Sequence, residues 1–149
     1  MNALPSSPEP DDAAPQRPRR PWAHKFGDAL RGLKFGIRGH SSFFVHFFVA
    51  AMVIAAGILL QCRPLQWAVL LLCIGFVLTA ELFNSAIETL HRGLDAQTRE
   101  RTWKALDIAA GAVLLASITA ALVGLGIFGW QLARLAGWVA NSAELVSLH

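Results

Sequence analysis

The sequence predicts an all-α integral membrane protein, with three transmembrane helices preceded by an amphipathic cytoplasmic surface helix. The chain has 149 residues, of which 54% are hydrophobic and only 15% are charged, a balance outside that of ordinary soluble domains. Three long stretches carry no formal charge: residues 39–62, 64–80 and 108–133. A helix needs roughly 20 mainly apolar residues to cross a bilayer core, whereas a soluble bundle would show charges on one face of each helix. The pattern favours membrane spans over a soluble core.

The segment before the first span divides into a tail and a surface helix. Residues 1–21 are rich in proline, serine and charge, which is typical of a disordered tail, and they lack the apolar run of a cleavable signal. Residues 22–38 place Trp22, Phe26 and Leu30 at helical spacing, with basic side chains on the other side. Such a stripe indicates a helix that lies in the membrane surface. A short soluble helix packed on a loop is the alternative.

The membrane domain is expected to cover residues 22–130, with its three spans at about 43–60, 65–90 and 104–130. A tight outer turn between the first two spans is predicted by the run Gln61-Cys62-Arg63-Pro64. Residues 91–103 are interpreted as a charged connector, with a helix break at Gly93, because glycine is a weak helix former.

The third span carries small residues every three or four positions: Ala105, Ala109, Ala112, Ala116 and Ala120. In a bilayer such a stripe lets helix backbones approach closely, so it indicates a face for packing between helices or copies of the chain. Residues 131–149 are expected as a tail that forms a second interfacial helix, with Trp130 and Trp138 as interface residues.

The basic residues predict the orientation in the membrane. Lys and Arg gather before the first span (Arg17, Arg19, Arg20, Lys25, Arg31, Lys34, Arg38) and between the second and third (Arg92, Arg99, Arg101, Lys104). The other two segments have one basic residue each, Arg63 and Arg134. By the positive-inside rule the N-terminus is cytoplasmic and the C-terminus lies on the far side. Basic residues beside a membrane attract anionic headgroups, so no nucleic-acid partner is expected.

The candidate site lies at the cytoplasmic end of the second span. Glu81, Asn84 and Glu88 share one helix face because they are three and seven positions apart. A carboxylate inside a membrane is costly and indicates a functional site, and Asp107 is expected at the same depth on the third span. These oxygens could hold Mg²⁺ while the ion binds substrate phosphates. The alternative is that Glu88 and Asp107 merely pair with Arg92 or Lys104 at the interface.

No other motif indicates competing chemistry. The sequence contains no GxxxxGK[ST], CxxC or HExxH motif. Cys62 and Cys73 are interpreted as small packing residues rather than a disulfide or metal pair. His46, inside the first span, is interpreted as a hydrogen-bonded packing residue, and Gly124 and Gly126 as packing residues of an apolar stretch.

The segments ELFNSAIE from Glu81 and LDIAAGAVLL from Leu106 resemble the small prokaryotic diacylglycerol kinase and undecaprenol kinase family. The resemblance covers about residues 25–128 and includes ALRGLKFGI before the first span and the pair Phe43 and His46. It implies a homotrimeric lipid kinase of the inner (cytoplasmic) membrane. Such a kinase would transfer the γ-phosphoryl group of MgATP to the hydroxyl of a membrane lipid alcohol of the diacylglycerol or undecaprenol type.

The resemblance also implies roles for individual residues. Glu81 would be the general base on the lipid hydroxyl, and Asn84 would orient the catalytic site. Glu88 would be a metal ligand beside the nucleotide, and Asp107 would help to hold the nucleotide. His40 takes the position of the family's second metal ligand, with Mg²⁺ or Mn²⁺ as the ion.

Three positions depart from the family pattern. His40 replaces a glutamate, Leu106 replaces a lysine, and Arg92 replaces an aspartate. Neutral imidazole suits softer metals better than Mg²⁺, and the missing lysine removes a charge expected on the phosphates. An alternative is therefore a catalytically impaired family member that acts as a lipid-binding or structural membrane protein. A small channel or proton-relay protein would use the same carboxylates without ATP.

Overall fold

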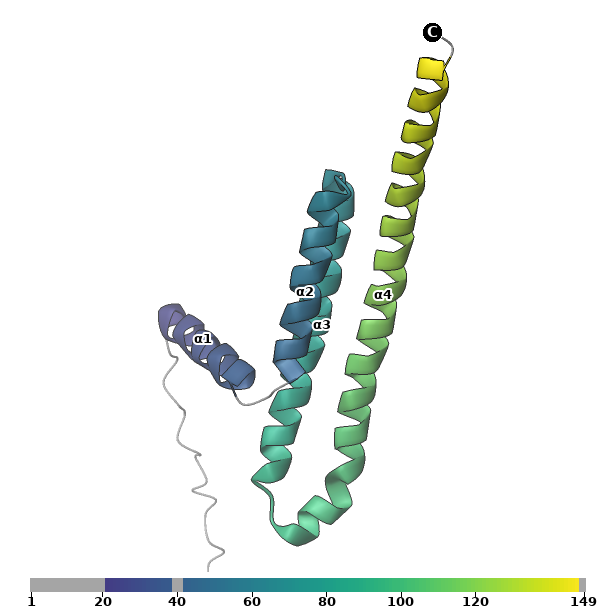
Figure 1. Ribbon diagram of the computed structural model, residues 1–149. Coiled ribbons are helices and arrows are strands. Elements are labelled where there is room, and N and C mark those ends of the chain that lie inside the picture. The colour runs from purple at the N-terminus through teal and green to yellow at the C-terminus, as the bar shows by residue number, and fades with distance from the viewer. Residues whose placement is uncertain (1–20, 39–41, 148–149) are drawn as a thin grey trace, which may run out of the picture.

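The computed structural model describes residues 21–38 and 42–147, with side chains up to residue 137. The elements in this part of the chain are all helices: α1 (Trp22–Arg38), α2 (Ser42–Leu59), α3 (Pro64–Arg92) and α4 (Ala96–Ser147). The last three stand side by side with alternating directions, and α1 leaves the bundle at an angle (Figure 1). Three of these helices are long and apolar enough to cross a membrane, which confirms the predicted class. The predicted tail up to residue 20 and His40 lie outside the described residues.

Helix α1 has an apolar stripe that the rest of the chain leaves largely uncovered. Trp22, Phe26 and Leu30 are all exposed, and the ammonium of Lys25 lies 4.7 Å from the centre of the Trp22 ring. The C-terminal end of α1 touches α3, where Gly36 lies against the Leu82 side chain because it has no Cβ to clash with it. An apolar stripe that the chain leaves uncovered is what a helix in the membrane surface requires.

The turn between α2 and α3 is a Schellman motif. Gln61 takes the left-handed conformation, with φ of 53°. The amide of Cys62 donates to the carbonyl of Gly57 at 3.0 Å, and that of Gln61 donates to the carbonyl of Ile58 at 3.1 Å, which are the two bonds that define this motif. Pro64 then begins α3, where its missing N–H costs no hydrogen bond. The tight turn expected here is present.

The connector between α3 and α4 is shorter than expected. Helix α3 ends at Arg92 and α4 already begins at Ala96, so most of the charged segment 91–103 is helical. The carboxylate of Asp95 accepts a hydrogen bond from the backbone amide of Thr98 at 3.0 Å and so caps the first turn of α4. The hydrogen bonds from Thr98 hold the pKa of Asp95 below its ordinary value.

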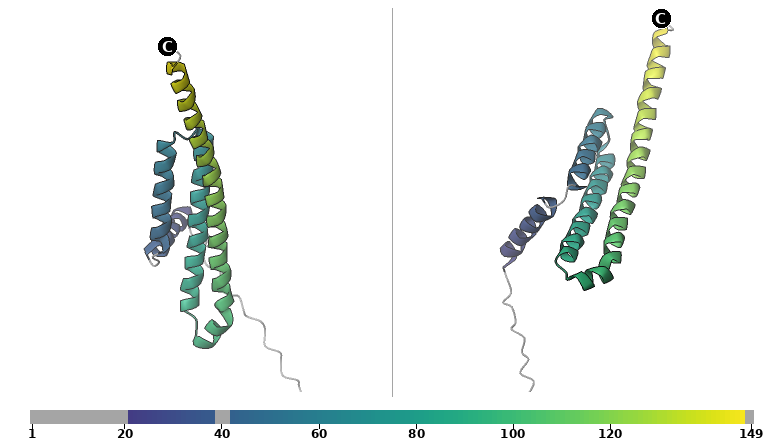
Figure 2. Two further views of the ribbon diagram at one scale, coloured as in Figure 1. Left: turned by 45° about the vertical axis from the view of Figure 1, so that its right-hand side comes forward. Right: turned by 60° about the horizontal axis from the view of Figure 1, so that its bottom comes forward.

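Helix α4 also continues further than expected. It runs unbroken to Ser147, so residues 131–147 continue this helix and do not form the separate helix that was expected. Both further views show α4 projecting beyond the ends of α2 and α3 (Figure 2). Its 52 residues correspond to about 78 Å, well beyond the roughly 30 Å of a bilayer core.

The three long helices pack mainly through α3. Helix α4 lies along α3 and makes few contacts with α2. Ala109 and Ala116 of the small-residue stripe are buried, whereas Ala112 is exposed. Near the α2–α3 turn, the buried Gln131 donates a hydrogen bond to the carbonyl of Gln61 at 2.9 Å. The fold therefore holds α4 against α3 at both ends and leaves the space between α2 and α4 open.

Candidate functional site

Glu81 is buried where α3 meets the start of α2. Its side chain is 3% exposed, and the Ser42 hydroxyl donates a hydrogen bond to its Oε1 atom. The Nε2 atom of His46 lies 3.7 Å from its Oε2 atom. Burying a carboxylate costs several kcal/mol unless partners replace water. The first two turns of α2 therefore supply the groups that let Glu81 lie inside the bundle.

Asn84 and Glu88 lie further along α3 and line a cavity of about 290 Å³ against α4. Asp107 and Leu106 line the same cavity from α4. The side-chain amide of Asn84 donates a hydrogen bond to Oε1 of Glu88 at 3.1 Å. The structure thus brings three of the four described residues of the predicted site to one cavity, at the end of the bundle where α3 and α4 are connected.

Arg92 makes the contact that the alternative interpretation predicts, in which Glu88 pairs with a basic residue at the membrane interface. Its guanidinium lies 3.2 Å from Oε2 of Glu88, with side chains 60% and 38% exposed. An exposed pair four positions apart on a helix contributes only a few tenths of a kcal/mol. Lys104, the other expected partner, instead places its ammonium 5.9 Å from the centre of the Trp103 ring. Arg92 also lines the cavity together with Leu106, so a positive charge is present where the expected lysine is missing.

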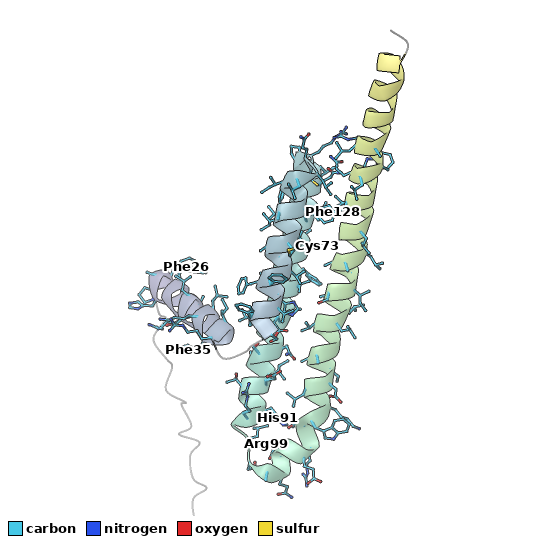
Figure 3. All side chains as sticks on the ribbon, in the orientation of Figure 1. Phe26, Phe35, Cys73, His91, Arg99 and Phe128 are labelled. Atoms are coloured by element: carbon cyan, nitrogen blue, oxygen red, sulfur yellow. The ribbon has the colours of Figure 1, made fainter. Side chains whose placement is uncertain are left out.

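The connector fixes α4 against the end of α3 beside this cavity. His91, which lines the cavity, has its Nδ1 atom 3.2 Å from the Thr102 hydroxyl. The Arg99 guanidinium donates to the carbonyl oxygens of Arg92 at 2.8 Å and Leu94 at 3.2 Å, which would otherwise be unpaired at a helix end. His91 and Arg99 lie together where the two helices meet (Figure 3). These contacts set the position of Asp107 relative to α3.

The oxygen atoms of the cavity fit Mg²⁺ only together with substrate oxygens. Within the described ranges, no group of three or more His, Cys, Asp and Glu side chains could hold a metal ion. Mg²⁺ is commonly bound by one or two carboxylates plus substrate phosphates and water, without a cage made of protein alone. Glu88 and Asp107, with the Asn84 amide, supply this kind of donor set. His40, the other candidate ligand, is outside the described residues.

The predicted polar stripe makes contacts with two different helices. Glu81 reaches α2, whereas Asn84 and Glu88 line the cavity with α4. Of the two partners of Glu81, Ser42 was not singled out from the sequence, and His46 was interpreted as a hydrogen-bonded packing residue without a named partner. The four-residue spacing of Ser42 and His46 places them on the same face of a helix. Nothing in that spacing says that the face meets Glu81.

Comparison with known proteins identifies the family. The sequence profile described as prokaryotic diacylglycerol kinase matches residues 27–128, more than half of the chain. The chain belongs to this family. It is 37% identical over 100 residues to a diacylglycerol kinase of Synechocystis sp., covering 66% of this chain and 57% of that protein. It is 31% identical over 103 residues to an undecaprenol kinase of Bacillus subtilis, covering 69% of this chain and 84% of that protein. No solved structure matches.

The prokaryotic diacylglycerol kinase profile covers the whole described site, from Ser42 to Asp107. It ends at residue 128, whereas α4 continues to Ser147. The C-terminal part of α4 therefore lies beyond the region shared with the family. The match spans little more than half of the Synechocystis protein's length.

Proposed function

We propose that the protein is a lipid kinase that transfers the γ-phosphoryl group of ATP to the hydroxyl of a membrane lipid alcohol of the diacylglycerol or undecaprenol type. The observation that carries the proposal is the arrangement of acidic and amide side chains at the end of a membrane-spanning helix. Glu81 lies at the membrane end of this arrangement, and Asn84, Glu88 and Asp107 line a cavity at its cytoplasmic end. A membrane lipid and a water-soluble nucleotide can meet at such a place.

The chain's own residues then divide the work of phosphoryl transfer, which depends mainly on positioning and electrostatic stabilisation. Glu81 provides the basic group for the hydroxyl proton. Asn84 holds the Glu88 carboxylate by its hydrogen bond of 3.1 Å and so keeps an oxygen ligand in place. Arg92 supplies positive charge for the phosphates from the wall of the cavity.

Glu88 would hold the divalent ion, with Asp107 on the opposite wall of the cavity, and phosphate oxygens and water would supply the remaining ligands. When bound, Mg²⁺ neutralises the charge that develops on the phosphates. His40 adds a nitrogen ligand in our proposal, which makes Mn²⁺ an alternative ion.

The membrane arrangement follows from the same proposal. The protein lies in the inner membrane of the cell. Its N-terminus and the α3–α4 connector face the cytoplasm, because the basic residues gather in these two segments. This orientation gives the cavity access to cytoplasmic ATP. Copies of the chain assemble as a homotrimer, with the exposed Ala112 on a face open to a neighbouring copy.

A transfer assay with several lipid alcohols tests the function against both alternatives. The purified protein in lipid nanodiscs receives γ-labelled ATP and Mg²⁺, with diacylglycerol, undecaprenol or no added alcohol. The kinase proposal predicts label in the lipid phase only with an acceptor. A lipid-binding or structural protein gives no labelled lipid. A channel or proton relay gives ion flux across liposomes that does not depend on ATP.

A further inference from the structure

His91 lies on the wall of the cavity that Glu88 and Asp107 line, and the proposed function gives it no role. It lines this cavity from α3, three residues after Glu88, and it is half-buried. Its side chain lies where the end of α3 meets the start of α4 (Figure 3). Imidazole is a common ligand of divalent metal ions. The cavity therefore contains a nitrogen donor as well as carboxylate oxygens.

The hydrogen bonds of Thr102 determine which ring nitrogen of His91 carries the proton. The Thr102 hydroxyl has one hydrogen and donates it to the backbone carbonyl of Thr98 at 2.9 Å. The same hydroxyl oxygen lies 3.2 Å from Nδ1 of His91. Because the hydroxyl hydrogen is already used, Nδ1 must be the donor in this contact, which assigns the tautomer from the hydrogen-bond network. In the neutral ring, Nε2 then keeps a free electron pair.

A hydrogen bond of this kind is typical of histidines that bind a metal ion. Such a histidine binds the ion through one ring nitrogen and nearly always donates the other N–H to a nearby oxygen, which fixes the tautomer and the orientation of the ring. Thr102 supplies that oxygen from α4, and the Asp95 cap orders the turn of α4 that precedes it. The imidazole of His91 is therefore oriented before any ion binds.

Glu88 and His91 have the spacing that lets two side chains of one helix bind the same ion. Residues three positions apart have Cβ atoms roughly 5–6 Å from each other, and the bonds from an ion to imidazole nitrogen and carboxylate oxygen are each about 2.0–2.2 Å. A Glu-x-x-His sequence binds metal ions in the cores of helical bundles, and residues 88–91 have this form. Asn84 holds the carboxylate by its hydrogen bond of 3.1 Å, and the exposed pair with Arg92 is too weak to keep it from an ion.

We propose that His91 binds the divalent ion of the nucleotide through Nε2, beside Glu88. This inference rests on the proposed kinase function and names a ligand of its metal site. Within the described ranges no group of three or more His, Cys, Asp and Glu side chains could hold a metal ion, so phosphate oxygens and water complete the coordination. One nitrogen among several oxygens favours first-row transition ions over Mg²⁺. Thr102 is a positioning residue, because it acts through the imidazole.

The competing explanation is that the contact between His91 and Thr102 only fastens α4 to α3. Arg99 already joins the same two helix ends, since its guanidinium donates to the carbonyl oxygens of Arg92 and Leu94. The attachment of α4 therefore does not depend on an imidazole at position 91. For the same reason, we expect His91→Gln to fold with α3 and α4 in their wild-type arrangement, which makes the variant suitable for binding measurements.

The first test detects the nitrogen on the ion without turnover. Protein labelled with ¹⁵N-histidine, in nanodiscs, receives Mn²⁺ and the non-hydrolysable nucleotide β,γ-methylene-ATP, and pulsed EPR measures the coupling between Mn²⁺ and histidine nitrogen. All samples carry His40→Gln, because the proposed function also assigns a nitrogen ligand to His40. We expect the coupling of a directly bound imidazole in this protein, its loss when His91→Gln is added, and its retention when His24→Gln is added, since His24 is exposed on α1. No coupling in the His40→Gln protein, or coupling that survives His91→Gln, would overturn the proposal.

The second test measures metal affinity and the part played by Thr102. The affinity of the protein–nucleotide complex for Mn²⁺ is obtained from the EPR signal of the free ion, and Mg²⁺ is added as a competitor. We expect Thr102→Val to weaken Mn²⁺ binding about 10- to 100-fold, the usual effect of removing a hydrogen-bond partner of a metal ligand, and Thr102→Ser to keep the wild-type affinity. His91→Gln should weaken Mn²⁺ binding at least as much and lower the preference for Mn²⁺ over Mg²⁺. An unchanged Mn²⁺ affinity in His91→Gln, or equal weakening in Thr102→Val and Thr102→Ser, would contradict the proposal.

Failure of this inference and failure of the kinase function give different results. Phosphate transfer to a lipid alcohol without any coupling of Mn²⁺ to histidine nitrogen would leave the kinase function in place and overturn the role of His91. If the protein phosphorylates no lipid alcohol, the kinase function fails. Coupling that disappears with His91→Gln would in that case still support His91 as a ligand of a nucleotide-bound ion.

Discussion

Replacing Glu81 by glutamine removes the negative charge and keeps the size of the side chain. The amide oxygen can still accept the hydrogen bond from the Ser42 hydroxyl, which in the wild type goes to Oε1. The side chain is only 3% exposed, and burying a neutral amide costs less than burying an ion. We therefore expect Glu81→Gln to fold and to unfold at a temperature close to that of the wild type.

The catalytic effect should be large, because an amide cannot take the hydroxyl proton. Loss of a positioned general base lowers the rate by about 10² to 10⁴, which corresponds to about 3 to 5 kcal/mol in the barrier. The assay is phosphate transfer to the acceptor lipid in nanodiscs, with thermal unfolding measured on the same sample. Glu100→Gln, an exposed carboxylate on the first turns of α4, is the matched control and should keep full activity. A near wild-type rate in Glu81→Gln would refute Glu81 as the base.

Further predictions concern topology, assembly, metal and helix capping. An impermeant thiol reagent applied to intact cells should label a cysteine placed at Ser147 but not at Ser6, and the reverse would contradict the orientation. Ala112→Leu should weaken the oligomer in mild detergent, since bulk separates helix backbones; an unchanged oligomer would mean that this face points elsewhere. His40→Glu should raise activity specifically with Mg²⁺, and an unaltered rate and metal preference in His40→Ala would show that it is no ligand. Because the folded state lowers the pKa of Asp95 from 3.8, the charged cap contributes fully at pH values well above 3.8 and is lost as the pH falls through the lowered pKa. Asp95→Ala should therefore speed amide exchange in the first turn of α4, with Asp95→Asn as the capping-competent control; equal exchange in both would exclude the cap.

Much of the fold could be predicted because a membrane imposes strong local rules. The uncharged stretches place the three spans to within a few residues of α2, α3 and the central part of α4. Pro64 begins α3 as a residue without an N–H should, and Gly93 follows its last residue. Such signals depend only on neighbouring residues and on the length of the uncharged stretch, so they can be identified from the sequence alone.

The sequence-based prediction of the fold is wrong where local signals compete with helix capping and packing. Residues 96–103 are charged but have good helix propensity, and the Asp95 cap starts α4 before the apolar stretch begins. Beyond Trp130 the composition changes without a helix-breaking proline, so α4 simply continues. The left-handed residue of the α2–α3 turn is Gln61 rather than glycine, and no sequence rule marks it.

The candidate site could be predicted only in part. The spacing of Glu81, Asn84 and Glu88 follows from helix geometry, and the depth of Asp107 follows from the span lengths. Which helix each side chain meets depends on the rotation of the helices about their axes. For that reason the contact of His46 with Glu81 emerges from the fold and not from the motif.

The stoichiometry of a single reaction tests the kinase account most directly. Purified protein in nanodiscs with a preferred lipid alcohol receives γ-labelled ATP, and ADP, lipid phosphate and free phosphate are measured together. The account predicts one lipid phosphate for each ADP, with little free phosphate, and loss of both products in Glu81→Gln. Free phosphate equal to ADP, or no ADP with any lipid alcohol, would contradict phosphoryl transfer at this site.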